Sequence, residues 1–95
     1  MMAADDRAER TVQIINELGL HMRAGTQFVK LAAKFPCDIT VSKNTSEVNG
    51  KSILSLMTLM APKGTTITLK AKGERAEEAV AALAALIADK FGEGK

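Results

Sequence analysis

The chain has 95 residues, of which 46% are hydrophobic and 3% aromatic, and its formal net charge is +2. This length predicts one domain, residues 1–95, around a single hydrophobic core. So few aromatic rings and so small a net charge argue against nucleic-acid binding, which needs stacking platforms and clustered basic residues. The single cysteine cannot form an internal disulfide, which fits a reducing cytoplasmic location.

The first twenty residues predict a leader, a strand and a loop. Residues 1–9 are charged and lack an apolar run, so we expect a flexible leader and no signal peptide. Residues 11–16 alternate and predict a strand with Val12 and Ile14 on one face. Gly19 then gives the loop backbone freedom just before the only histidine. No stretch of the chain is long enough to span a bilayer, so we expect no membrane insertion.

From Met22 the spacing of the apolar residues becomes helical, and Pro36 is expected to end this helix. The apolar residues that recur at steps of three and four are Phe28, Leu31, Ala32 and Phe35. Residues 37–42 alternate and predict a half-buried strand, in which Cys37 is inert core rather than a reactive thiol. After a turn, residues 47–49 predict a short edge strand.

Residues 52–60 predict a short helix with Ser52 as its N-cap. Its apolar residues cover an arc of roughly 220°, about twice what packing onto a core requires. Leu56, Leu59 and Met60 can face inward. The residues then left near solvent are Ile53, Leu54 and Met57. This surplus indicates a docking surface, although Leu and Met at helical spacing are also typical of ordinary core.

The last two elements are a strand and an alanine-rich helix. Residues 65–72 alternate and predict a strand. Residues 76–91 predict a helix, whose core stripe is Val80, Leu83, Leu86 and Ile87. The element order is β-α-β-β-α-β-α. Alternating strands leave one sheet face polar, so the helices should cover the other face. The expected fold class is therefore α+β, a two-layer open-faced β-sandwich.

The junction between the first strand and the first helix carries the candidate chemistry. His21 lies there, with Arg23 two positions further on. A helix N-terminus has unpaired N–H groups and partial positive charge, and it attracts phosphate. A neutral imidazole can act as a nucleophile, and the arginine donors fit phosphate oxygens. The pattern predicts that His21 accepts a phosphoryl group that Arg23 stabilises. On spacing alone, a surface histidine without a role fits equally well.

Other phosphate chemistry is not indicated. The chain has no Gly-rich phosphate loop, no Walker-type lysine and no paired carboxylates for Mg²⁺, so we do not expect it to bind ATP. One histidine and one cysteine are too few for a typical zinc site. We expect no cofactor and no metal. Because no acid–base pair is visible, we expect a carrier rather than an enzyme.

Three segments carry a resemblance to a known family: Gly19-Leu-His21-Met-Arg23, Asn49-Gly-Lys-Ser52-Ile-Leu-Ser-Leu-Met57, and Lys63-Gly64. Together they resemble the HPr family, the histidine-containing phosphocarrier proteins of the bacterial phosphoenolpyruvate-dependent phosphotransferase system. The resemblance runs from about residue 10 to residue 91. It implies a four-stranded antiparallel sheet with three helices on one face. It also implies enzyme I as the phosphoryl donor and sugar-specific IIA proteins as acceptors. A carrier that docks several partners through one face is expected to be a monomer.

The resemblance also implies roles for individual residues. His21 matches the phosphorylated histidine, which carries the group on Nδ1, and Arg23 matches the active-centre arginine. Ser52 matches the residue that an ATP-dependent HPr kinase/phosphorylase modifies in some bacteria, although a plain N-cap role is sufficient to explain it. The residues that match the partner-docking face are Met22, Thr26, Gln27, Lys30, Ile53, Leu54 and Met57.

One departure from the family pattern keeps a second hypothesis open. The family usually reads His-x-Arg-Pro, whereas this chain has Ala24 followed by Gly25. Alanine can adopt the same geometry at a cost under about 1 kcal/mol, and Gly25 is expected to loosen the helix by a similar amount. The alternative is a regulatory HPr-like module that binds a transcription factor or an enzyme, with Ser52 setting the affinity. A nitrogen-linked phosphotransferase branch lies between the two hypotheses.

Overall fold

The computed structural model describes residues 6–95. Its elements, in chain order, are β1 (Arg7–Gln13), α1 (Met22–Ala32), β2 (Asp38–Lys43), β3 (Ser46–Asn49), α2 (Ile53–Met57), β4 (Thr66–Lys72), α3 (Ala76–Ala88) and a 3₁₀ turn, η2 (Lys90–Gly92). This order confirms the predicted β-α-β-β-α-β-α succession. Of the expected leader, residues 1–5 lie outside the described residues, whereas residues 7–9 belong to β1, so the strand begins earlier than predicted.

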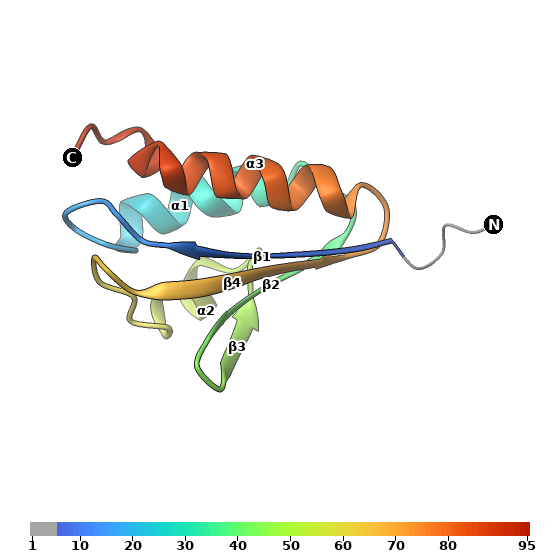
Figure 1. Ribbon diagram of the computed structural model, residues 1–95, viewed down its shortest axis with the longest axis horizontal. Helices are drawn as coiled ribbons and strands as arrows, with labels where there is room; N and C mark the ends of the chain where they lie inside the picture. Colours follow the sequence, from blue (N-terminus) through green and yellow to red (C-terminus); the bar gives the residue numbers. More distant parts are fainter. Residues whose placement is uncertain (1–5) are drawn as a thin grey trace.

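The four strands form one antiparallel sheet in the order β1-β4-β2-β3. The two long helices, α1 and α3, lie together on one face of this sheet (Figure 1), and α2 packs against α1 and β3. The short strand β3 lies at the edge, as predicted. The predicted open-faced sandwich, with a four-stranded antiparallel sheet and three helices, is therefore confirmed.

Alternation along the strands separates the two sheet faces. The register pairs Val12 with Ile67 and Val41 with Leu69, so apolar side chains meet on the helix-covered face. In β2 and β4, which were predicted from their alternation, the buried alternate positions are Ile39, Val41, Ile67, Leu69 and Ala71. Thr40 and Thr68, on the intervening positions, are less buried. The helices complete the core with Phe28 from α1 and Leu83 and Ile87 from α3.

Met60 corrects one prediction about the second helix. It was expected to face inward, yet it is 75% exposed. The reason is that α2 ends at Met57 instead of continuing to residue 60, and Met60 adopts a left-handed backbone with φ of 52°. The ammonium of Lys43 donates hydrogen bonds to the carbonyls of Leu59 (2.9 Å) and Met60 (2.8 Å) and holds this reversal. Leu56 and Leu59 are buried as predicted.

The segment that follows α3 lies at the same end of the molecule as the loop between β1 and α1 (Figure 1). The predicted helix over residues 76–91 ends at Ala88 instead, and Phe91, with φ of 55°, turns into the core within η2. Beyond it, the Glu17 N–H donates a hydrogen bond to the Lys95 carbonyl at 2.9 Å. Within residues 6–95, no helix combines the length and the hydropathy needed to cross a membrane.

Candidate functional site

The loop before α1 is held by a close backbone contact at Gly19. Its φ is +70°, and a Cβ added there would lie 2.7 Å from the Ala61 carbonyl oxygen and from Pro62 Cα. The next residue, Leu20, donates its N–H to the Ala61 carbonyl at 2.9 Å. Only glycine tolerates both the left-handed backbone and this close approach. The contact determines where the following residue, His21, meets the helix.

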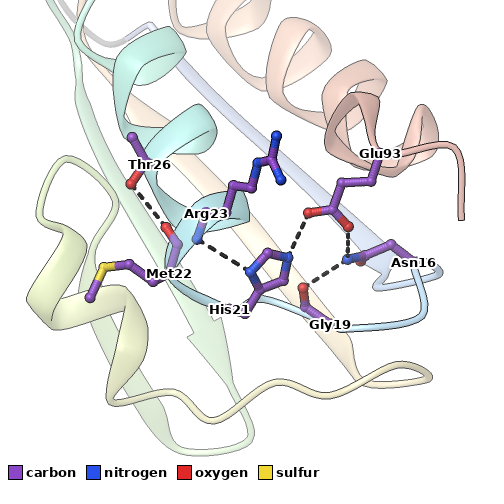
Figure 2. A network of polar contacts seen from close by, with 7 residues as sticks. All are labelled: Asn16, Gly19, His21, Met22, Arg23, Thr26 and Glu93. Carbon is purple, nitrogen blue, oxygen red and sulfur yellow. Dashed lines mark hydrogen bonds and ion pairs between the residues drawn. The ribbon is translucent and has the colours of Figure 1, made fainter.

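His21 is the N-cap residue of α1. Its Nδ1 accepts a hydrogen bond from the Arg23 backbone N–H at 3.3 Å, and its carbonyl accepts the Gly25 N–H at 2.8 Å. The ring therefore lies at the opening turn of the helix (Figure 2), with 27% of the side chain exposed. It is neither surrounded by aliphatic side chains nor remote from the helix N-terminus, and either placement would have excluded a phosphoryl-acceptor role.

The other ring nitrogen contacts a residue that the sequence analysis did not single out. The Nε2 of His21 lies 2.5 Å from Oε2 of Glu93, whose side chain is 16% exposed. Because a backbone N–H can only donate, Nδ1 must carry the lone pair, and the ring proton of a neutral imidazole must then reside on Nε2. In this arrangement the lone pair of a neutral ring lies on Nδ1, at the start of α1.

Arg23 brings a positive charge to the cavity that His21 also lines. Its side chain extends from the first turn of α1 (Figure 2), and together with His21, Gln27 and Glu93 it lines a cavity of about 660 Å³. In the described part of the chain, no carboxylate lies within ion-pair distance of its guanidinium. The charge is therefore available to an anion bound at His21.

Ser52 is the N-cap of α2, as predicted. Its Oγ accepts the Ser55 N–H at 3.2 Å, and the residue is half-buried. In the first helix Gly25 follows the buried Ala24, and a Cβ at Gly25 would lie 2.7 Å from Cε of Met57. A Cβ there would displace only the flexible end of the Met57 side chain, so the site shows tight packing between α1 and α2 but no strict need for glycine.

The residues expected to dock partners differ in exposure. Met22 and Leu54 are exposed, Leu54 by 78%. Ile53, Met57 and Thr26 are half-buried. The hydroxyl of Thr26 donates to the Met22 carbonyl at 2.9 Å. Gln27 and Lys30 are exposed on α1. Among the apolar residues of the predicted docking face, Leu54 and Met22 are exposed, whereas Ile53 and Met57 are half-buried.

Sequence reasoning missed two further groups near His21. Leu18 and Met60 are exposed apolar side chains that line a shallow hollow beside the ring. Asn16 and Glu93 form the polar support of the ring. No local spacing could have indicated Glu93, because it lies 72 positions after His21. The only indication in the sequence of a polar contact here was Asn16, a polar residue at the apolar end of the predicted strand.

Among residues 6–95 there is no cluster of three or more His, Cys, Asp or Glu side chains that could hold a metal ion. Cys37 is a buried free thiol. The chemistry available at the site is therefore that of an imidazole at a helix N-terminus, with an arginine beside it and a carboxylate behind it.

The fold and the site together define a small open-faced sandwich that presents a histidine at the start of its first helix. A family model described as the PTS HPr component phosphorylation site matches residues 8–89. The chain is 48% identical over 87 residues to the phosphocarrier protein HPr of Neisseria meningitidis serogroup A. The alignment covers 92% of this chain and 98% of that protein. The chain is 41% identical over 87 residues to the phosphocarrier protein NPr of Shewanella violacea, with 92% and 96% covered.

The fold comparison agrees. The crystal structure of HPr-C-His from Thermoanaerobacter tengcongensis superposes with a TM-score of 0.88 at 44% identity, covering 90% of this chain and 97% of that one. The chain belongs to the HPr family of the phosphotransferase system. It is a phosphocarrier protein and not a catalytic enzyme.

Proposed function

We propose that this chain accepts a phosphoryl group on Nδ1 of His21 from phosphorylated enzyme I and passes it to IIA proteins of the phosphotransferase system. The observation that carries the proposal is the ring geometry. Nδ1 accepts a hydrogen bond from the N-terminal amide of Arg23, while Nε2 lies 2.5 Å from the Glu93 carboxylate. The lone pair therefore lies at the N-terminus of α1, where the positive end of the helix dipole attracts an incoming anion.

The phosphoryl group would be bound weakly and remain accessible. His21 is partly exposed, and Arg23 reaches the same cavity from the first turn of α1. A guanidinium and backbone N–H groups can stabilise the phosphoryl oxygens without enclosing them. Such an open site suits a carrier, which must release the group to the next protein.

Partners are proposed to dock on the surface that α1 and α2 present around His21. The candidate contacts are Met22, Thr26, Gln27, Lys30, Ile53, Leu54 and Met57. Exposed Leu54 and Met22 support an apolar contact, and Lys30 on α1 supports attraction to an acidic partner. We propose a cytoplasmic monomer, because one face has to serve several partners in turn.

The test is phosphorylation in a purified system with phosphoenolpyruvate and enzyme I. The wild-type protein should gain an acid-labile phosphoryl group, and His21→Ala should gain none. Ser52→Ala is the matched control and should be labelled like wild type. Arg23→Ala should accept the group about tenfold more slowly, which corresponds to about 1.4 kcal/mol of lost stabilisation. Undiminished acid-labile labelling of His21→Ala would refute the proposal.

We further propose that Ser52 is a regulatory phosphorylation site. Its phosphate would be stabilised electrostatically at the N-terminus of α2, but it would place negative charge next to exposed Leu54. Docking of acidic partners should weaken. A Ser52→Asp variant should therefore accept the phosphoryl group from enzyme I more slowly than Ser52→Ala, and equal rates would contradict this role.

A second candidate function is a regulatory branch that ends at regulatory proteins instead of sugar-specific IIA proteins. The similarity to a phosphocarrier named NPr favours considering it. A purely regulatory module should gain no acid-labile phosphate from enzyme I and only an acid-stable phosphate on Ser52 from a cognate kinase. A regulatory branch of the same relay should be labelled on His21 but should transfer poorly to sugar-specific IIA proteins.

A further inference from the structure

The carboxylate of Glu93 joins His21 to a buried asparagine. Its Oε2 lies 2.5 Å from Nε2 of His21, and its Oε1 accepts a hydrogen bond from Nδ2 of Asn16 at 3.0 Å (Figure 2). Both carboxylate oxygens are therefore engaged. With Nδ1 facing the Arg23 N–H, the whole ring is fixed between the helix N-terminus on one side and this carboxylate on the other.

The side-chain amide of Asn16 is held in the orientation that binds this carboxylate. The residue is completely buried, and Nδ2 also donates to the Gly19 carbonyl at 2.8 Å. Two acceptors therefore fix the orientation of its amide. The Oδ1 atom is left without a hydrogen-bond donor among the described residues, which is unusual for a buried carbonyl. The Nδ2 group of Asn16 thus binds both the Gly19 carbonyl and the Glu93 carboxylate, while its Oδ1 has no hydrogen-bond donor among the described residues.

The chain on both sides of Glu93 is also anchored. Phe91 packs into the hydrophobic core, and the Lys95 carbonyl accepts the Glu17 N–H at 2.9 Å. The backbone that carries Glu93 is therefore anchored before it by Phe91 and after it by Lys95, and Asn16 binds the carboxylate itself. Its contact with the ring does not depend on a single mobile side chain.

We propose, on the basis of the phosphocarrier function proposed above, that Glu93 is a positioning residue for phosphoryl transfer. Its carboxylate retains the proton on Nε2 of His21 through both transfers. It thereby keeps Nδ1 available as the nucleophile and keeps the phosphorylated ring in the form that gives the group up readily.

In the accepting step, the Nδ1 lone pair attacks phosphorus, and the bond from phosphorus to the donor nitrogen breaks with its electron pair returning to the donor. His21 exchanges no proton. Because Nε2 keeps its hydrogen, the ring becomes a phosphorylated imidazolium with one positive charge. The carboxylate of Glu93 at 2.5 Å is placed to balance that charge, and Arg23 lies where it can balance the phosphoryl oxygens.

In the donating step, the lone pair of the acceptor nitrogen attacks phosphorus, and the Nδ1–P electron pair returns to Nδ1. With the proton still on Nε2, His21 leaves as a neutral imidazole. Without that proton it would have to leave as an imidazolate, which is a much poorer leaving group. The same contact therefore assists transfer in both directions.

The experiment compares Glu93→Gln, which removes the charge and keeps the side-chain shape, with Glu93→Asp, which keeps a carboxylate. Glu17→Gln is the matched control, because Glu17 borders the same cavity and no bond joins its side chain to His21 in the described structure. Three quantities are measured. They are the ring tautomer of the unphosphorylated protein by ¹⁵N NMR, the single-turnover rate of transfer from phosphorylated enzyme I, and the half-life of the isolated phosphoprotein at neutral pH.

We expect wild type and Glu17→Gln to show the proton on Nε2, and Glu93→Gln to show a mixture of tautomers. The transfer rate of Glu93→Gln should fall about tenfold, and its phosphohistidine should survive longer than that of wild type. Glu93→Asp should recover part of the rate. An unchanged tautomer in Glu93→Gln overturns the proposal, whatever happens to the rate, and so does an equal rate loss in Glu17→Gln. Because the tautomer is measured without phosphorylation, a failure of the carrier function would be recognised separately, by wild type gaining no label.

Discussion

Replacing Gly19 with alanine should displace the loop that presents His21. Gly19 has a φ of +70°, and its position is surrounded by backbone atoms, with a Cβ falling 2.7 Å from Ala61 O and Pro62 Cα and 3.1 Å from Lys63 N. Distances below about 3 Å to backbone cannot be relieved by rotating a side chain. The loop or the 61–63 segment has to move.

The magnitude follows from two contributions. A left-handed backbone costs an alanine about 1–2 kcal/mol relative to glycine. Forcing a methyl group against packed backbone costs about a further 1–3 kcal/mol. The sum, about 2–5 kcal/mol, is a large part of the stability of a small domain, and it should lower the melting temperature by roughly 8 °C or more.

The matched control is Gly64→Ala. Gly64 also has a positive φ, +95°, but no atom lies within 4 Å of its added Cβ. It should therefore lose only the backbone contribution, about 1–2 kcal/mol. Urea denaturation of both variants isolates the contact contribution as the difference between the two free energies of unfolding.

The same pair of variants tests the link from loop to function. At a temperature where both are folded, Gly19→Ala should accept the phosphoryl group more slowly, because the contact between His21 Nδ1 and the start of α1 depends on the loop. Gly64→Ala should resemble wild type in this assay. The reasoning is refuted if Gly19→Ala is no less stable than Gly64→Ala, or if its transfer rate is unchanged.

Three smaller changes test other parts of the molecule. Ser52→Ala should lower the free energy of unfolding by about 1 kcal/mol, as expected for a lost N-cap, and urea denaturation measures it. Lys43→Met removes both hydrogen bonds to the carbonyls of Leu59 and Met60, so amide hydrogen exchange should become faster just after α2 while the sheet amides keep their protection. Cys37→Ser buries a hydroxyl on the apolar face and should destabilise the fold by about 1–3 kcal/mol, whereas the native thiol should resist thiol reagents until the protein unfolds.

Most of the fold could be predicted from the sequence because it follows from local patterns. Alternation in β2 and β4 indicated which side chains are buried, and the helical spacing in α1 located its core face. The N-cap Ser52 and the position of His21 at the start of a helix were predictable for the same reason, since a cap interacts with the backbone two or three residues away. Local hydrogen bonding and periodicity do not depend on the rest of the chain.

Other features were decided only when distant segments packed together. Met60 faces solvent because α2 ends early and Lys43 holds the reversal, and the Met57 side chain of α2 packs closely against Gly25 of α1. The carboxylate of Glu93 reaches His21 across 72 positions because the core binds Phe91 and turns the chain back toward the first loop. By itself the sequence determined the elements, their order and the histidine at a helix start. The tertiary structure decided that a carboxylate contacts the other ring nitrogen, because that contact joins residues 72 positions apart and no local pattern encodes it.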